Sequence, residues 1–316
     1  MPALDVVTRH PANPIVTRDD FPVPLEGAYN SGCVKLTTGR YLMAARVNEY
    51  NQRTAIWLLD SDDGIAFTPR PQPMAVPQTA SWQRYADSVI YDPRMTIIED
   101  TGELLMTMAC HSALGCRIAT FRACDHDGRD WEFVDYQGIP CHRNTVYFPR
   151  KINGLYAVLD RPNLAGNGGG NGGIWIKCSP DLRFWGAAER ICGPGDFLNH
   201  AAGGLGAGAP PILTERGWLC IIHCVMPAAN TLIYSVGAMI LDRDDPTRMV
   251  AKAPQPIMVP DAPYEMLGLV PSVCFPCGAV VEDDGEVKIY YGGADRVTAL
   301  GISSIDRLLA ACSESC

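Results

Sequence analysis

A hairpin pattern that occurs five times along the 316 residues most constrains the fold of this chain. In each copy an apolar stretch leads into a short turn with a glycine, and a second apolar stretch follows. The turn glycines are separated by 63, 52, 63 and 68 residues; they are Gly39, Gly102, Gly154, Gly217 and Gly285. Glycine accepts the positive φ that a tight hairpin turn demands. A pattern repeated at such spacing is typical of a repeat architecture.

A second element follows each hairpin at a similar distance. It is a strand that carries Ser or Asp into a turn, and its copies read LLDSDDGIAF, FRACDHDGRDWEF, WIKCSPDLRFWG, MILDRDDPTRMV and GISSIDRLLA. The two elements supply three or four antiparallel strands per repeat. They predict an all-β fold, a five-bladed β-propeller with about 50–65 residues per blade. The alternative is a β-sandwich with coincidental hairpins, which five in-phase copies disfavour.

The end of the chain departs from the strand pattern. The stretch SSIDRLLAACSESC has Leu and Ala at helical spacing and predicts a short terminal helix. We expect residues 1–316 to form one single propeller domain. The glycine-rich stretch AGNGGGNGG (165–173) lacks the Lys-Ser/Thr of a phosphate loop and is interpreted as an inter-strand loop. Whether it covers the site stays open.

Composition and charge exclude several classes of function. The net charge of −9 disfavours nucleic-acid binding by a broadly basic surface. No run of about 18 apolar residues occurs, which predicts no membrane span. The N-terminal stretch has no apolar core of a signal peptide, and the 13 cysteines are odd in number, so we expect a cytoplasmic location. The lone C-x-x-C at Cys274–Cys277 has no second pair at zinc spacing, and we predict no metal site.

Polar residues recur at equivalent positions of the aligned repeats. The strands after the turn glycines reach Arg46, His111, Arg161, His223 and Asp295, and the strands before them begin near Asn30-Ser31, Asp92-Pro93-Arg94, Arg143-Asn144 and Phe275-Pro276. Because the start of one hairpin strand lies beside the end of the next, these groups should converge on one mouth of the channel.

That mouth would collect two acids, Asp92 and Asp295, and a group of cations consisting of Arg46, Arg94, Arg143, Arg161 and His223. The alternative is that each charge caps a blade edge or forms a structural ion pair, and Arg94 fits that interpretation better than the others. So many cations at one place predict an anionic ligand, since Arg binds phosphate or carboxylate oxygens in a bidentate manner.

Several longer motifs occur in a fixed order: YNSGCVK, YDPR, RNTVYFPRKINGLYAVLDRP, SPDLRFWG, GAGAPPILTERGWL, ILDRDDP and FPCGAVVEDDG. In that order and spacing the chain closely resembles glycoside hydrolase family 130, the five-bladed β-propeller mannoside phosphorylases. The likeness covers nearly the whole chain. Two positions depart from the usual pattern: Arg161 stands where relatives can have Lys, and Cys224-Val225 replaces a more usual Gly-Val.

The resemblance implies a role for each matching residue. Asp92 matches the general acid of the family. Asn30, Ser31 and Asp295 match positions that hold the mannosyl unit. The phosphate-binding positions are matched by Arg143, Asn144, Arg161, His223 and Tyr234, with Arg46 near them. No cofactor is implied, because inorganic phosphate is a co-substrate.

The implied reaction needs only one catalytic carboxylate, that of Asp92. Inverting hydrolysis needs a second carboxylate to activate water, whereas phosphate is already an anionic nucleophile. The resemblance implies inverting phosphorolysis of a β-1,4-mannoside to α-mannose 1-phosphate, with Asp92 acting through the mannose 3-hydroxyl. The alternatives are a β-mannoside hydrolase, a phosphorylase of β-1,2-linked mannosides, and a propeller that only binds sugars or proteins. The acceptor sugar and association into a homo-oligomer stay open.

Overall fold

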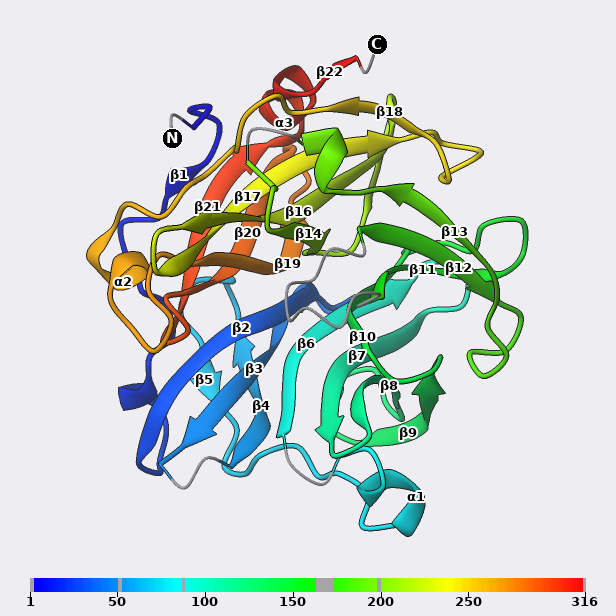
Figure 1. Ribbon diagram of the computed structural model, residues 1–316. Helices are drawn as coiled ribbons and strands as arrows, with labels where there is room; N and C mark the ends of the chain where they lie inside the picture. The colour runs from blue at the N-terminus through cyan, green and yellow to red at the C-terminus, as the bar shows by residue number, and fades with distance from the viewer. Residues whose placement is uncertain (1–2, 51–52, 87–88, 163–172, 198–199, 315–316) are drawn as a thin grey trace.

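The computed structural model describes residues 3–50, 53–86, 89–162, 173–197 and 200–314. Its strands form five antiparallel sheets around a central axis, and the strands nearest the centre are β2, β6, β10, β14 and β19 (Figure 1). This arrangement confirms the predicted five-bladed β-propeller. Among the described residues, no helix is long and apolar enough to cross a bilayer.

In three blades the strands pair in chain order from the centre outward. Blade 1 contains β2 (Leu25–Lys35), β3 (Tyr41–Glu49), β4 (Thr54–Ser61) and β5 (Thr68–Pro69). Blade 2 contains β6 (Val89–Ile98), β7 (Glu103–Ser112), β8 (Gly115–Ala123) and β9 (Trp131–Gln137). Blade 3 contains β10 (His142–Tyr147), β11 (Tyr156–Pro162), β12 (Ile174–Ser179) and β13 (Gly186–Cys192).

The other two blades recruit strands from the chain ends. Blade 4 contains β14 (Gly204–Ala207), β15 (Ile212–Thr214), β16 (Gly217–Ala228), β17 (Thr231–Leu241), β18 (Met249–Lys252) and β22 (Ser313–Glu314). Blade 5 contains β19 (Cys274–Val281), β20 (Glu286–Gly293), β21 (Val297–Ser304) and β1 (Thr8–Arg9). Because β1 pairs with β21, residues from the start of the chain complete the last blade and close the ring.

The helical segments are short and lie outside the sheets. They are η1 (Arg18–Asp20), α1 (Ala80–Gln83), η2 (Pro194–Phe197), α2 (Pro263–Met266) and α3 (Ile305–Ala311). Helix α3 is the predicted terminal helix. Ser304 caps its N-terminus by accepting a hydrogen bond from the backbone N–H of Arg307, and Leu308 and Leu309 are buried. The five turn glycines of the repeats all have positive φ, as predicted.

The hydrophobic core lies mainly between neighbouring blades rather than at the centre of the ring. Leu42 and Ile56 of blade 1 pack with Met106 of blade 2, for example. Corresponding clusters join blades 2 and 3, 3 and 4, 4 and 5, and 5 and 1. Burial of these faces holds the sheets in a ring and leaves the axis to polar groups.

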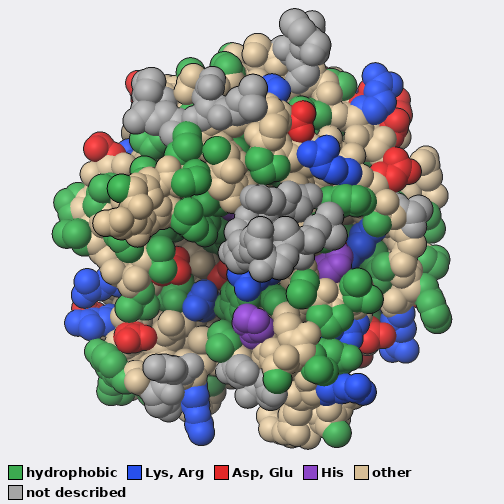
Figure 2. Space-filling model, viewed as in Figure 1, with side chains coloured by type: hydrophobic (Ala, Val, Ile, Leu, Met, Phe, Trp, Pro, Cys, Tyr) green, Lys and Arg blue, Asp and Glu red, His purple; other side chains and the backbone are tan. Residues whose placement is uncertain are grey.

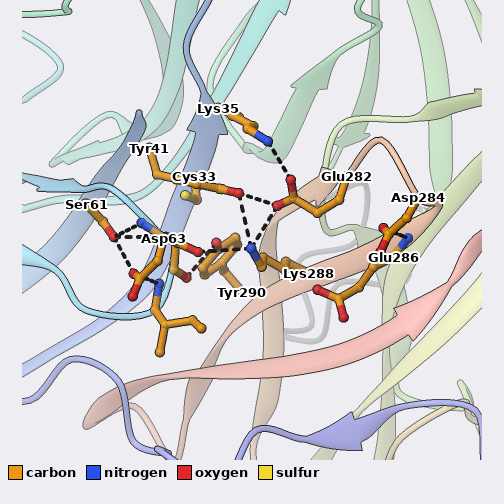
Figure 3. Close-up of polar contacts among 12 residues, drawn as sticks. Cys33, Lys35, Tyr41, Ser61, Asp63, Glu282, Asp284, Glu286, Lys288 and Tyr290 are labelled. Carbon is orange, nitrogen blue, oxygen red and sulfur yellow. Dashed lines mark hydrogen bonds and ion pairs between the residues drawn. The ribbon is translucent and has the colours of Figure 1, made fainter. Parts of the chain in front are cut away.

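The seam between blades 1 and 5 also contains a polar network, shown in Figure 3. Glu282 accepts hydrogen bonds from Lys35 Nζ at 2.6 Å, from Lys288 Nζ at 2.8 Å and from the Tyr41 hydroxyl. Burial alone would raise the pKa of Glu282, but these donors lower it to about 2. The carboxylate therefore links β2 and β3 to β20 where the ring closes.

The innermost strands of blades 1, 2 and 3 share one irregularity. Their pairing shifts register between Tyr29 and Gly32, between Tyr91 and Arg94, and between Arg143 and Val146. Each break contains a residue with positive φ; these are Asn30 (51°), Asp92 (53°) and Asn144 (58°). Asn and Asp tolerate this conformation better than most residues, and a bulge changes the direction in which a side chain points.

Candidate active site

A pocket opens among the innermost strands, and eight of the ten predicted site residues line it. These are Asn30, Arg46, Asp92, Arg143, Asn144, Arg161, Tyr234 and Asp295. Asn30, Asp92 and Asn144 were predicted near the starts of their strands. They lie instead at bulges within the strands, because β2, β6 and β10 begin earlier. In Figure 2, charged and hydrophobic side chains border a hollow near the middle of the molecule.

Asp92 lies at the meeting point of blades 1 and 2 and is mostly buried. Its Oδ1 accepts a hydrogen bond of 2.9 Å from Asn30 Nδ2 and lies 3.4 Å from NH1 of Arg46. Its main-chain carbonyl accepts a hydrogen bond from Arg94, whose Nε also donates to the carbonyl of Gly208. Arg94 thus holds the backbone beneath the carboxylate and does not line the pocket.

Asp295 lies in the turn that follows β20 and has a positive φ of 52°. Its carboxyl is partly open to the pocket and otherwise enclosed by protein. Burial raises the pKa of Asp295 to about 6; the Asp92 charge acts in the same direction, while Arg46 opposes both. The pocket therefore contains two carboxyl groups that differ in their environment, one bonded to Asn30 and one desolvated.

Two predicted sugar-side residues differ in their access to the pocket. The amide oxygen of Asn30 is buried and has no hydrogen-bond partner. Ser31 is fully buried, and its hydroxyl is bonded to the Thr298 hydroxyl at 2.7 Å. Ser31 therefore supports the bulge from behind, whereas Asn30 faces the pocket.

Another part of the pocket lining is a basic wall formed by Arg143, Asn144 and Arg161 of blade 3 and Tyr234 of blade 4. Burial and the charge of Arg143 lower the pKa of Arg161 to about 10. The Nε atoms of Arg143 and Arg161 are buried without hydrogen-bond partners. Within the described part of the chain, no carboxylate lies within 4.0 Å of either guanidinium. Buried groups of this kind require a partner, and an anion would supply one.

His223 lies behind this wall and does not line the pocket. It is fully buried, with its ring centroid 4.6 Å from that of Phe275. Burial and the charge of Arg161 hold the pKa of His223 well below its ordinary value, so its ring is neutral. Its Nε2 lies 3.4 Å from NH1 of Arg161 and can accept a hydrogen bond from it. The geometry makes His223 a support for Arg161.

Four lining residues were not among the predicted site residues: Tyr91, Val270, Val273 and Phe275. Tyr91 directly precedes Asp92, and its ring lies 5.2 Å from the Arg46 guanidinium. Val270 and Val273 belong to the segment after α2, where no motif marked them. Together with Phe275 they give the basic pocket one apolar side.

Two further predictions concern metals and the glycine-rich stretch. No group of three His, Cys, Asp or Glu side chains that could hold a metal ion occurs in the ranges that the structure describes. Of the glycine-rich stretch 165–173, residues 165–172 lie outside the described residues.

Comparisons with known proteins agree with this architecture. The family model of glycoside hydrolase family 130, described as beta-1,4-mannooligosaccharide phosphorylase, matches residues 3–314. The fold, the pocket and this match define a glycoside phosphorylase of the β-propeller type. The chain belongs to glycoside hydrolase family 130.

Similar proteins differ in the linkage that their names state. The chain is 32% identical to the beta-1,4-mannooligosaccharide phosphorylase of Ruminococcus albus, over 96% of this chain and 89% of that protein. It is 36% identical to the beta-1,2-mannobiose phosphorylase of Listeria innocua, over 76% of this chain and 63% of that protein.

A solved structure of beta-1,2-mannobiose phosphorylase from Listeria innocua, in complex with beta-1,2-mannobiose, superposes with a TM-score of 0.84. The sequence identity is 27%, and the match covers 96% of this chain and 98% of that structure. The family is therefore clear, while the linkage differs among the relatives.

Proposed function

We propose that this protein is an inverting phosphorylase that cleaves a β-1,4-mannoside with inorganic phosphate and releases α-mannose 1-phosphate. The family match and the relative from Ruminococcus albus, which is similar over 96% of this chain, support the β-1,4 linkage. The acceptor is a mannooligosaccharide, mannosyl-N-acetylglucosamine or mannosylglucose type of sugar. A beta-1,2-mannoside is the second candidate, because the superposed Listeria enzyme has that name.

The observation that carries the proposal is the basic wall in the pocket that also contains Asp92. Arg143 and Arg161 lie at the pocket with buried Nε atoms that have no partner. Phosphate has several acceptor oxygens and carries the negative charge that this wall lacks. Arginine binds such oxygens with paired, parallel hydrogen bonds.

In the proposed reaction, Asp92 is the general acid. A phosphate oxygen attacks the anomeric carbon from the side of Arg143 and Arg161, and the bond from that carbon to the bridging oxygen breaks. The leaving oxygen receives a proton that originates on Asp92 and passes through the mannose 3-hydroxyl. Phosphate replaces the general base of inverting hydrolases, so no second catalytic carboxylate and no cofactor are needed.

The remaining lining residues have positioning roles in this proposal. Asn30 and Asp295 hold hydroxyl groups of the mannosyl unit, with Ser31 supporting Asn30 through the bulge. Asn144 and Tyr234 contact phosphate beside the two arginines, and Arg46, which lies 3.4 Å from Asp92, belongs near this phosphate-binding group. His223 acts through Arg161, with which it is in contact.

We also propose a cytoplasmic setting and a function that requires only the saccharide and phosphate as partners. The twelve cysteines among the described residues are all free thiols, which fits a reducing compartment.

The test is incubation with β-1,4-mannobiose, with and without phosphate. We expect mannose 1-phosphate only when phosphate is present. Equal release of mannose without phosphate, and no mannose 1-phosphate with it, would instead identify a hydrolase. Parallel reactions with β-1,2-mannobiose, mannosylglucose and mannosyl-N-acetylglucosamine decide the linkage and acceptor; faster phosphorolysis of the β-1,2 substrate would overturn the β-1,4 assignment.

A further inference from the structure

Blade 3 contains a buried carboxylate, Asp160, that does not line the pocket but contacts its wall from behind. The side chain is almost completely buried. Its Oδ2 lies 2.7 Å from Lys177 Nζ and 2.5 Å from His142 Nδ1. Its Oδ1 accepts hydrogen bonds from the Thr145 hydroxyl at 2.6 Å and from the backbone N–H of Arg161 at 3.0 Å.

Three of these four contacts lead to the basic wall. His142 directly precedes Arg143, and Thr145 directly follows Asn144. The third of these contacts is with the backbone N–H of Arg161 itself. Arg143 and Arg161 are also paired across the β10–β11 ladder. A single carboxylate therefore contacts the chain beside each residue that blade 3 contributes to the pocket.

The same carboxylate stabilises a strained stretch of backbone. Asn144 has a φ of 58° inside the bulge of β10, a conformation that costs on the order of 1–3 kcal/mol unless its surroundings fix it. Asp160 is bonded on both sides of Asn144, to His142 before the bulge and to Thr145 within it. These bonds oppose relaxation of the bulge into regular pairing, which would turn Asn144 away from the pocket.

The contacts of Asp160 also determine which cationic side chains remain unpaired and available to bind a ligand. Burial alone would raise the pKa of Asp160, but the charge of Lys177 and the bond to His142 hold it well below its ordinary value. Asp160 is therefore ionised and compensates Lys177, which is itself buried. Arg143 and Arg161 form no such pair among the described residues, so their charge remains available to an anion.

We infer that Asp160 is a positioning residue that presets Arg143, Asn144 and Arg161 for phosphate, an inference that rests on the proposed phosphorolysis. It does not touch substrate, and its effect is carried by His142, Thr145 and the backbone of Arg161. Loss of this support displaces the donors of the wall, and displacements of about 1 Å in such sites can cost about 100-fold.

The experiment uses Asp160→Asn and the double variant Asp160→Asn with Lys177→Met in the full chain. The double variant removes both charges of the pair and so avoids an unpaired buried lysine if the single variant does not fold. Glu282→Gln is the matched control, because Glu282 is a carboxylate bonded to two lysines at the distant blade 1–blade 5 seam.

Three quantities are measured: the KM for phosphate, the KM for the mannoside, and the Kd of inorganic phosphate by calorimetry without sugar. We expect the KM and Kd for phosphate to rise about 10- to 100-fold in both Asp160 variants, with the KM for the mannoside unchanged. The Glu282→Gln control keeps both KM values.

Other outcomes overturn the inference in distinguishable ways. Equal changes in the two KM values, or no change in phosphate Kd in a folded variant, show that Asp160 is only structural while phosphorolysis stands. Absence of phosphate binding and of phosphorolysis in the unmodified protein removes the proposed function, and the inference with it.

Discussion

The side-chain amide of Asn30 donates a hydrogen bond of 2.9 Å to Oδ1 of Asp92, although the two residues belong to different blades. Both have positive φ and both lie at the bulge of an innermost strand. Gly32 lies beside this contact, and a Cβ there would be 2.7 Å from the carbonyl oxygen of Pro93. Close approach of the two bulges therefore sets the position of the candidate general acid.

Replacement of Asp92 by Asn tests the assignment of the acid. The amide cannot protonate a leaving group, yet its oxygen can still accept the hydrogen bond from Asn30. We expect the phosphorolysis rate to fall about 10²- to 10⁴-fold, with phosphate binding retained. Asp62→Asn, at a side chain that is 93% exposed, is the control and should leave the rate unchanged. Full activity of Asp92→Asn would assign the acid elsewhere.

Replacement of Arg161 by Met tests the basic wall. Removing a preorganised cationic donor should lower kcat/KM for phosphate about 10²- to 10³-fold. The free energy of unfolding should stay equal or increase, because a buried guanidinium without a carboxylate partner is removed. Steady-state kinetics and urea denaturation measure the two effects, with the exposed Arg183→Met as control. An unchanged dependence on phosphate would contradict the assignment.

Asp295 predicts a pH dependence of stability. Its pKa of about 6 in the folded protein lies above the ordinary value of 3.8, so the folded state binds more protons between these pH values. The free energy of unfolding should therefore fall as the pH rises through this window.

Asp295→Asn removes this dependence, and near pH 7 it should raise the free energy of unfolding by about 3 kcal/mol. Activity should fall, because the carboxyl group that we propose to hold the sugar is lost. Urea denaturation near pH 4 and near pH 7 checks the prediction. An equal loss of stability at both pH values would show that Asp295 is not desolvated in the folded state.

Replacement of Gly292 tests the close contact between blade 5 and Asn30, the residue that is bonded to Asp92. A Cβ at this position would lie 1.9 Å from Oδ1 of Asn30, so Gly292→Ala must displace the amide that contacts Asp92. We expect a loss of about 1–3 kcal/mol in stability, together with a lower kcat. Gly186→Ala, where a Cβ meets no atom within 4 Å, is the control. Native activity in Gly292→Ala would mean that Asn30 does not position Asp92.

Much of the fold could be predicted because its signals are local. The glycines at 39, 102, 154, 217 and 285 mark tight turns, and alternating apolar stretches on either side define the hairpins. Completion of blade 5 by β1 could not be predicted, since Thr8–Arg9 is too short to show a strand pattern. That pairing depends on contacts between residues almost 300 positions apart.

The candidate site was predictable where repeats align. Asp92 and Arg143 lie on equivalent strands of neighbouring repeats, Arg161 matches Arg46 on the strands that follow, and all four line the pocket. The bulges had a signal that was not used, since Asn and Asp at these positions favour positive φ. Val273 lines the pocket only because the segment after α2 folds back, with the N–H of Val273 bonded to the carbonyl of Glu265. No local sequence pattern predicts that this segment folds back.

The parts of the pocket are distributed over all five sheets. The candidate acid comes from blade 2, the basic wall comes from blades 3 and 4, and Asn30 and Asp295, which we propose to hold the sugar, come from blades 1 and 5. No single peptide segment contains the site, so its geometry is a property of the assembled ring. Catalytic turnover should therefore be lost as soon as the relative positions of the blades change. A mild denaturant concentration that weakens the contact between two blades should abolish activity. The far-ultraviolet circular dichroism should still be that of the native sheets.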